Sequence, residues 1–359
     1  MRSIEEKLYN SSMKIILQNQ AESGAYIACP NFKRYRYSWF RDGAFIAYSM
    51  DLWGNHQSSR RFHNWAARVI ETREGIIERA IRKVESNFPL NENEIIHTRY
   101  TVDGEEGKEQ WENFQLDGLG TWLWALKNHL LLSETEPSAS FIKASRLVGD
   151  YLQALWRLPC YDLWEEFPHK IHTYTLASIY AGLESEAFLN STDRIRCIEQ
   201  IKEFIYTNSI IDGHFVKHVQ SSEVDSSLLG LAVPYSVFPP EDSLIKNTVL
   251  LIEEKLVSGN GVHRYSEDSY YGGGLWILLT GWLGWYYVQV GNTERANRLK
   301  RWMEKQSDSG GQLPEQIPQF LNRPSCYQYW VEKCGPVAKP LLWAHAKYLI
   351  LLNVLSGKE

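Results

Sequence analysis

The sequence predicts an all-α protein built as an (α/α)6 barrel. Apolar residues recur mostly at helical spacing, long strand-like alternation is scarce, and short turns alternate with long loops. Short turns join antiparallel neighbours, so helices that pair as hairpins would leave every long loop on the same side of the molecule. Six such pairs would close a barrel with one face built from loops.

Twelve helices are expected, separated by turns and loops. Short turns lie at Gly54-Asn55, Ser133–Pro137, Asn190–Thr192 and Gly291-Asn292, and long loops lie at 21–40, 85–113, 158–171, 208–222, 257–271 and 308–338. Between these breaks the apolar spacing predicts helices at 3–20, 41–53, 56–84, 114–133, 139–157, 172–188, 192–207, 223–232, 241–256, 272–290, 292–307 and 339–356. The long loops hold nearly all the residues whose chemistry points to a function.

Two kinds of helix are expected. The segment 192–207 is polar on one face, whereas 272–290 is apolar nearly all round. An outer ring of amphipathic helices around an inner buried ring explains this contrast. Because no change of composition and no Pro/Ser-rich linker divides the chain, residues 1–359 are expected to form one domain.

Charge and composition narrow the class of partner. The formal net charge is -5, with 38 basic and 43 acidic residues interspersed, so neither nucleic acid nor an anionic membrane is an expected partner. Residues 1–8 have early acidic residues and no apolar segment, so a secretory signal is not expected there, and the apolar run 275–290 is short for a membrane span. Five cysteines without metal-binding spacing fit a reduced, cytoplasmic setting. Neither metal nor cofactor is expected, and the oligomeric state is left open.

Aromatic residues are unusually frequent, at 13% of the chain with 14 Trp and 20 Tyr. Most are expected to fill the core. Several instead stand beside charged side chains in predicted loops, as in Trp39-Phe40-Arg41-Asp42 and Trp111-Glu112. Flat rings next to hydrogen-bonding groups suit sugars, whose rings have apolar faces and hydroxyl edges.

Two carboxylates in separate loops are the candidate catalytic pair. Glu165 and Glu166 follow Trp164, and a large aromatic neighbour can raise the pKa of a carboxyl group enough for it to donate a proton. Glu315 lies in a Gly/Pro-rich loop and could activate water. Two carboxylates with opposite duties are the minimum equipment for hydrolysing a glycosidic bond. Each also has a plainer interpretation, as an acid in the first turn of a helix or as a surface loop residue.

Two further segments fit sugar binding. Arg41 and Asp42 open an apolar helix, where Asp42 could simply cap it, but an adjacent donor and acceptor can also grip neighbouring hydroxyls. Arg264 precedes a segment that contains Gly272–Gly274 and ends at Trp276. This segment is neither a P-loop nor a dinucleotide fingerprint, because it lacks Gly-Lys-Ser/Thr and no strand precedes it.

Together these segments resemble the glucoamylase family, family 15 of the glycoside hydrolases. Tyr-Ser-Trp-Phe-Arg-Asp at 37–42 is similar to the family's Tyr-x-Trp-x-Arg-Asp, Asp162–Glu166 matches its general-acid motif, and Pro314–Gln316 matches the motif of its catalytic base. The resemblance implies that Glu165 donates the proton and that Glu315 activates the water. It implies that the glucose is bound or enclosed by Tyr35, Trp39, Arg41, Asp42, Trp111, Trp164, Glu166, Arg264 and Trp276.

The resemblance implies an (α/α)6 fold and exo-hydrolysis of an α-linked glucose with inversion, on a substrate of the maltose, isomaltose or short-dextrin type. Inversion requires room for water, so the two carboxyl groups should lie roughly 6.5–9.5 Å apart. Three alternatives stay open: trehalose hydrolysis, a non-catalytic glucan-binding or regulatory barrel, and an enzyme of the same fold with lyase or phosphorylase chemistry.

Overall fold

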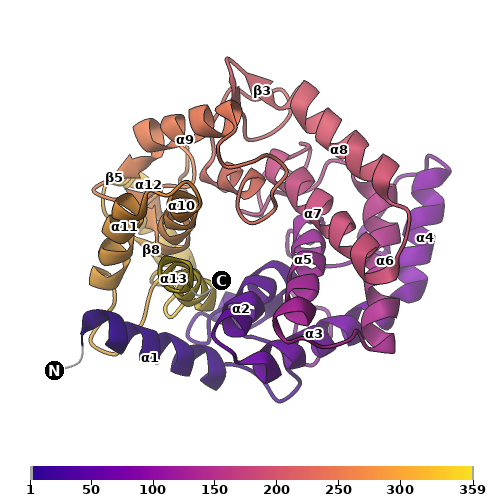
Figure 1. Cartoon of the computed structure of the whole chain (residues 1–359), viewed down its shortest axis with the longest axis horizontal. Coiled ribbons are helices and arrows are strands. Elements are labelled where there is room, and N and C mark those ends of the chain that lie inside the picture. The colour runs from indigo at the N-terminus through magenta and orange to yellow at the C-terminus, as the bar shows by residue number, and fades with distance from the viewer. Residues whose placement is uncertain (1–2, 358–359) are drawn as a thin grey trace.

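Two concentric rings of helices form the molecule (Figure 1). The computed structural model describes residues 3–357. The inner ring consists of α2 (Phe40–Leu52), α5 (Asp117–Leu132), α7 (Thr173–Asn190), the 3-10 helix η3 (Ser226–Leu231), α10 (Ile277–Gln289) and α13 (Leu342–Leu355). Each of these elements contacts the next in chain order, and α13 contacts α2, which closes the circle. This is the inner ring of an (α/α)6 barrel, so the predicted fold class is confirmed.

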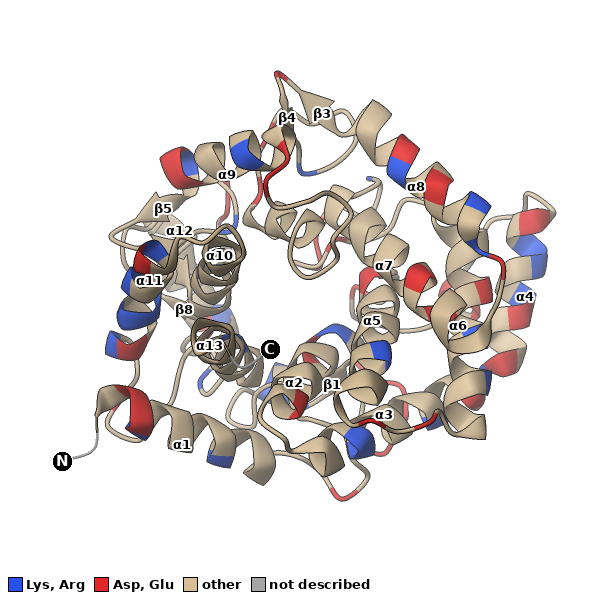
Figure 2. Cartoon of the chain, viewed as in Figure 1, with Lys and Arg blue, Asp and Glu red and all other residues tan. Residues whose placement is uncertain are grey.

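The outer ring packs against the inner one, as the hairpin pattern predicts. Its members are α1 (Ile4–Gln18), α3 (His56–Glu71), α6 (Ala139–Leu155), α8 (Ile195–Asn208), α9 (Ser243–Leu256) and α11 (Thr293–Lys305), with α4 (Glu74–Glu85) outside α6. The buried side chains of α8 are Cys197, Ile201 and Ile205, one helical turn apart. Charged residues gather on outer helices such as α4, α8 and α11, whereas α10 has none (Figure 2). Burial on one face or on all faces therefore sorts the helices into rings.

Short strands tie the loops together at one end of the barrel. β1 (Ser38–Trp39) pairs with β2 (Arg99–Tyr100), and β3 (Ile210–Ile211) pairs with β4 (His214–Phe215). A four-stranded antiparallel sheet runs β5 (Val257–Ser258), β6 (Gly261–Val262), β7 (Leu275–Trp276) and β8 (Gln316–Ile317). In this sheet Trp276 is opposite Gln316, so the residue before Gln316 is held beside the start of α10.

The helix predicted at 56–84 is wrong as a single element. It is broken at Thr72 and Arg73 into α3 and α4. Both side chains donate to the carbonyl of Val69, and Arg73 also donates to the carbonyl of Gly104. These bonds compete with the helical ladder, and Arg73 leaves the helical conformation at φ -113° and ψ 15°. Apolar periodicity continues across such a break, so spacing alone did not detect it.

The helix predicted at 223–232 is a 3-10 helix confined to η3. Asp225 caps it by accepting from the amide of Ser227, and Pro234, which has no amide hydrogen, follows closely after its end. The helix expected at 272–290 starts only at Ile277, because Leu275 and Trp276 form β7. One helix was not predicted: α12 (Pro324–Cys334) lies inside the expected loop 308–338.

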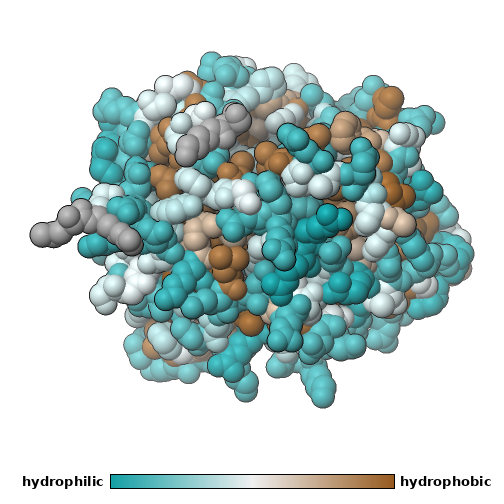
Figure 3. Space-filling model, turned by 60° about the horizontal axis from the view of Figure 1, so that its bottom comes forward, coloured by the Kyte–Doolittle hydropathy of each residue, from teal (hydrophilic) through white to brown (hydrophobic). Residues whose placement is uncertain are grey.

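The helix starts of the inner ring lie beside one cavity. The first turns of α2, α10 and α13 contribute Arg41, Asp42, Leu278 and Trp343 to its lining, and loops preceding inner helices contribute most of the rest. The outer surface is different in character, since Figure 3 shows a face that is mostly hydrophilic with hydrophobic residues interspersed. Between residues 3 and 357, no helix combines the length and the apolar character needed to cross a bilayer.

Candidate active site

The structure brings all eleven residues selected from the sequence to one cavity of about 250 Å³. Residues from five of the six predicted long loops line it, all but 208–222. Ligand cavities commonly span roughly 300–1,000 Å³, so this one is slightly smaller than that range. The eleven residues are Tyr35, Trp39, Arg41, Asp42, Trp111, Trp164, Glu165, Glu166, Arg264, Trp276 and Glu315.

A tight turn presents Glu165 to the cavity. The carboxylate of Asp162 accepts from the amides of Trp164 and Glu166, both at 2.9 Å, and the amide of Glu165 donates to the carbonyl of Asp162. Glu165 has φ 67°, in the left-handed region that few non-glycine residues adopt. Because α7 starts only at Thr173, the interpretation of Glu165 and Glu166 as acids in the first turn of a helix is wrong.

Two side-chain donors fix the Glu165 carboxylate. Trp39 donates from its indole nitrogen at 2.8 Å and Gln115 from its amide at 3.2 Å, both to Oε1. Gln115 is itself oriented by Arg41, whose guanidinium donates to the amide oxygen at 2.9 Å. Arg41 also donates to Asp117 at 2.9 Å. A chain of buried polar contacts therefore connects the start of α2 to the candidate acid.

Asp42 is close to Arg41 but is not strongly paired with it. The nearest approach, from Arg41 Nε to Asp42 Oδ2, is 3.8 Å. Burial raises the pKa of Asp42 to about 7 and outweighs the opposing charge of Arg41. Asp42 therefore retains hydrogen-bonding capacity for a ligand, in agreement with its position in the lining.

Glu315 is the more deeply buried carboxylate of the predicted pair. Its side chain is buried, and Oε2 has no hydrogen-bond partner among the described residues. Its amide donates to Ala338, and its carbonyl accepts from Ile277 at the start of α10. Burial raises the pKa of Glu315 to about 8, while a hydrogen bond from Tyr35 and the charge of Arg264 oppose that rise. The raised pKa thus belongs to the proposed base and arises from its burial, whereas the sequence had predicted a raised pKa for a glutamate beside Trp164.

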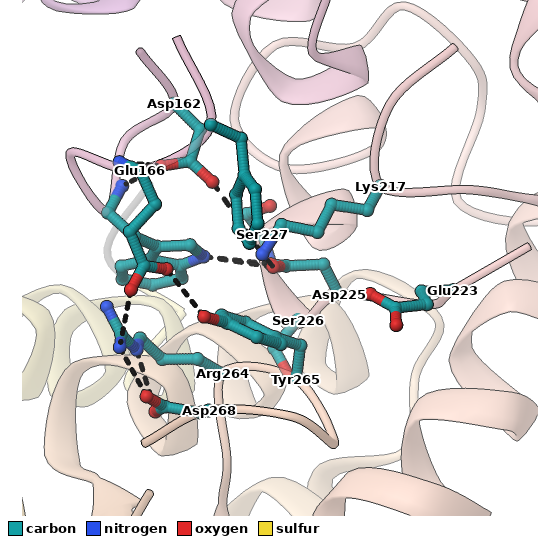
Figure 4. Close-up of polar contacts among 12 residues, drawn as sticks. Asp162, Glu166, Lys217, Glu223, Asp225, Ser226, Ser227, Arg264, Tyr265 and Asp268 are labelled. Atoms are coloured by element: carbon teal, nitrogen blue, oxygen red, sulfur yellow. Dashed lines mark hydrogen bonds and ion pairs between the residues drawn. The ribbon is translucent and has the colours of Figure 1, made fainter. Parts of the chain in front are cut away.

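Glu166 belongs to the same turn and is held by Tyr265 and Arg264, as Figure 4 shows. Tyr265 donates to its Oε2 at 2.6 Å, and Arg264 lies 3.6 Å from its Oε1. Arg264 is in turn fixed by two bonds to Asp268. A buried guanidinium placed in this way can bind hydroxyl groups while its own charge stays balanced.

Aromatic rings form the walls. Trp164 and Trp276 have ring centroids 5.5 Å apart, and Trp39 and Trp111 meet edge to face at 5.9 Å. The Trp111 ring is held from behind by Arg99, whose guanidinium carbon lies 3.6 Å from the ring centroid. Flat apolar walls with polar groups at their edges match the two surfaces of a sugar ring.

Several lining residues were not selected from the sequence. Trp330, Lys333 and Cys334 reach the cavity from α12, and Tyr270 lies against Tyr35 with their hydroxyl oxygens 2.9 Å apart. The signal for α12 was available, since a proline at a helix start is typical and apolar residues follow at helical spacing. The glycines and prolines on either side obscured it.

One group within residues 3–357 has the composition of a metal site, and it does not line the cavity. Asp51, His63 and His129 offer ligand atoms within 4.8 Å of one another. Asp51 already accepts hydrogen bonds from His56, Ser59 and His129. The spacing of these residues along the chain carries no metal motif.

Comparison with known proteins identifies the family. Residues 3–303 match the family model described as glycosyl hydrolases family 15. The chain belongs to this family. It is therefore a glycoside hydrolase, as predicted. An isomaltose glucohydrolase of Kribbella flavida is 38% identical over 98% of this chain and 93% of its own length.

Three further proteins are similar to this family 15 chain. A glycosidase variant in complex with glucose is 37% identical, with a TM-score of 0.94 over 98% of this chain and 97% of its own. Trehalase 1 of Sulfolobus acidocaldarius is 25% identical over 74% of this chain, which spans 48% of that enzyme's length. A glucoamylase of Hormoconis resinae, 16% identical, shares the fold with a TM-score of 0.71 over 99% of this chain and 74% of its own.

Proposed function

We propose that this family 15 hydrolase is an inverting, exo-acting α-glucosidase that releases β-glucose from the non-reducing end of short α-glucosides. One observation carries the proposal: Glu165 and Glu315 line a single small cavity together with the aromatic and charged residues selected for glucose binding. The isomaltose glucohydrolase activity named for the Kribbella flavida relative favours isomaltose among the candidate substrates. A cavity of about 250 Å³ suits the terminal unit of a substrate, in agreement with exo action.

In the proposed reaction Glu165 protonates the glycosidic oxygen as the bond to C1 breaks. Glu315 takes a proton from a water that attacks the opposite face of C1. Arg41, Asp42 and Glu166 bind hydroxyls of the terminal glucose, together with Tyr35 and Arg264. The separation of roughly 6.5–9.5 Å between the two carboxyl groups stays a prediction.

The raised pKa of Glu315 has a consequence for this scheme. A base must be ionised to accept a proton, and a pKa of about 8 leaves much of the carboxyl population protonated at neutral pH. Positive charge developing at C1 stabilises the ionised form in the transition state. Turnover should therefore follow the ionised fraction of Glu315.

We place the enzyme in the cytoplasm, and its cysteines support this. All five are free thiols in the structure, which suits a reducing compartment. Trehalose is the second candidate substrate, because trehalases are among the relatives.

The test combines a substrate panel with two variants. Isomaltose, maltose, trehalose and maltoheptaose are compared for glucose release, and Glu165→Gln and Glu315→Gln are expected to lose nearly all turnover with an unchanged circular dichroism spectrum. Glu294→Gln, an exposed change on α11, is the matched control. Near-normal turnover in either cavity variant would contradict the assigned roles, and no turnover by the unaltered protein on any substrate would favour the non-catalytic barrel.

A further inference from the structure

Lys217 is a buried lysine that the reaction scheme does not use. It follows β4, its side chain is 3% exposed, and it does not line the cavity. Its backbone is held on both sides: its amide donates to the carbonyl of Glu223, and its carbonyl accepts from the amide of Thr173, the first residue of α7. The position of its backbone, from which the side chain extends, is therefore fixed by the fold.

The ammonium group of Lys217 lies between two buried carboxylates (Figure 4). Nζ is 3.1 Å from Asp225 and 3.7 Å from Asp162. The ring of Tyr265 covers it, with Nζ 3.2 Å from the ring centroid. Within residues 3–357, no other cation forms an ion pair with either carboxylate. A buried charge with this set of partners is strongly coupled to them.

Both carboxylates hold the turn that presents Glu165. Asp162 accepts the amides on either side of Glu165, from Trp164 and Glu166. The indole nitrogen of Trp164 donates to both carboxylate oxygens of Asp225, at 3.2 Å to Oδ1 and 3.0 Å to Oδ2. Trp164 is thus anchored through its backbone by one carboxylate and through its ring by the other, and Lys217 joins the two.

The turn needs such an anchor because its backbone is strained. Glu165 and Phe167 both have positive φ, 67° and 53°, which costs of order 1–3 kcal/mol at each non-glycine position. Burial raises the pKa of Asp162 to about 7 even with the opposing charge of Lys217. Without that charge Asp162 would become neutral and accept hydrogen bonds from the turn less strongly.

We propose that Lys217 is a positioning residue for the general acid: through Asp162 and Asp225 it holds the 162–166 turn so that the Glu165 carboxyl meets the glycosidic oxygen. Lys217 itself touches neither substrate nor the reacting atoms. The inference rests on the proposed function, since it assigns Glu165 the acid role.

The test uses two substrates that differ in their need for an acid. The second glucose of isomaltose leaves as an alkoxide unless the glycosidic oxygen is protonated. In α-glucosyl fluoride, fluoride leaves with the bonding electron pair and needs no proton. In both cases water adds to C1 and gives its proton to Glu315. Lys217→Met should lower kcat on isomaltose by about 100-fold, the loss expected from a misplaced catalytic group, and retain turnover of the fluoride.

Asp225→Asn is the second variant, because it keeps an acceptor oxygen for Trp164 while removing the charge that faces Lys217. Asp225→Asn should also lower kcat on isomaltose and retain turnover of the fluoride, but its loss on isomaltose should be smaller than that of Lys217→Met. Lys347→Met is the matched control: Lys347 is also buried, on α13, and lies outside the cavity lining and the network. It should leave the ratio of the two rates unchanged.

The outcomes separate the inference from the function it rests on. Equal loss on both substrates in Lys217→Met and Asp225→Asn, or no loss on isomaltose, would overturn the positioning role. Unfolding of both variants, seen by circular dichroism, would also overturn it by assigning the network to the fold. Inactivity of the unaltered enzyme on both substrates would instead overturn the proposed function, and the inference with it.

Discussion

The hydroxyl of Tyr35 should tune the ionisation of Glu315, and Tyr35→Phe removes it. The Tyr35 hydroxyl, whose oxygen is 2.9 Å from that of Tyr270, also acts on Glu315 as a donor and lowers a carboxyl pKa that burial raises to about 8. The phenylalanine ring preserves the contacts that Tyr35 makes with Phe32 and Trp39. The perturbation is therefore a loss of one donor at the proposed base.

The size of the effect follows from the hydrogen bond. A bond to a charged group contributes about 1.5–3 kcal/mol, and about 1.36 kcal/mol corresponds to one pKa unit, so the pKa of Glu315 should rise by about one to two units. At pH 7 the ionised fraction of the proposed base then falls by about 10- to 100-fold, and kcat/KM falls with it. The ratio of unaltered to variant kcat/KM should be constant below about pH 8. It should shrink as pH rises further, because Glu315 then ionises in both proteins.

The assay is kcat/KM on isomaltose across this pH range, since kcat/KM reports the ionisation of the free enzyme. Tyr26→Phe is the matched control, because Tyr26 also has a hydrogen-bonded hydroxyl, with Ser58 as its partner, and lies outside the cavity lining. A ratio for Tyr35→Phe that does not change with pH, or that grows as pH rises, would refute the reasoning.

Three further changes test packing and access. Lys347→Met should stabilise the fold by about 1–3 kcal/mol in urea denaturation, since burial without an ion pair lowers the pKa of the lysine well below its usual value. This gain should be larger at pH 7 than at pH 10, because the proton binds more strongly to the unfolded lysine than to the buried one and is more available at pH 7. An equal or negative gain would contradict the prediction. Arg194→Met should destabilise the fold by about 3–5 kcal/mol, because buried Glu186 loses the positive charge that lies 2.7 Å from it. An unfolding midpoint within error of the unaltered protein would count against this. Trp330→Ala should shift relative kcat/KM from isomaltose toward maltoheptaose by opening the α12 side of the cavity, and an unchanged ratio would show that α12 does not limit access.

The fold and the lining of the site could be predicted because both depend on local pattern. The alternation of short turns and long loops was sufficient for the barrel, and short motifs such as Arg41-Asp42 lie directly at helix starts, where the fold brings them to one end. The single-domain organisation of residues 1–359 and the separation of the two carboxyl groups stay predictions.

What the sequence did not reveal depends on contacts between distant segments. Lys217 resembles a surface lysine until the fold places Asp162 and Asp225 on either side of it. The raised pKa of Glu315 arises from burial, which no neighbour in its own loop indicates. The break at Arg73 likewise depends on the carbonyl of Gly104, which belongs to another segment.

The most direct test of the central claim, that Glu165 and Glu315 act as acid and base in an inverting hydrolysis, is a proton NMR time course with isomaltose, followed from the first minutes. We expect the anomeric signal of β-glucose to appear first and the signal of α-glucose to follow only as mutarotation proceeds. Early α-glucose would contradict the account, because it would require a covalent intermediate and a different division of labour between the two carboxylates.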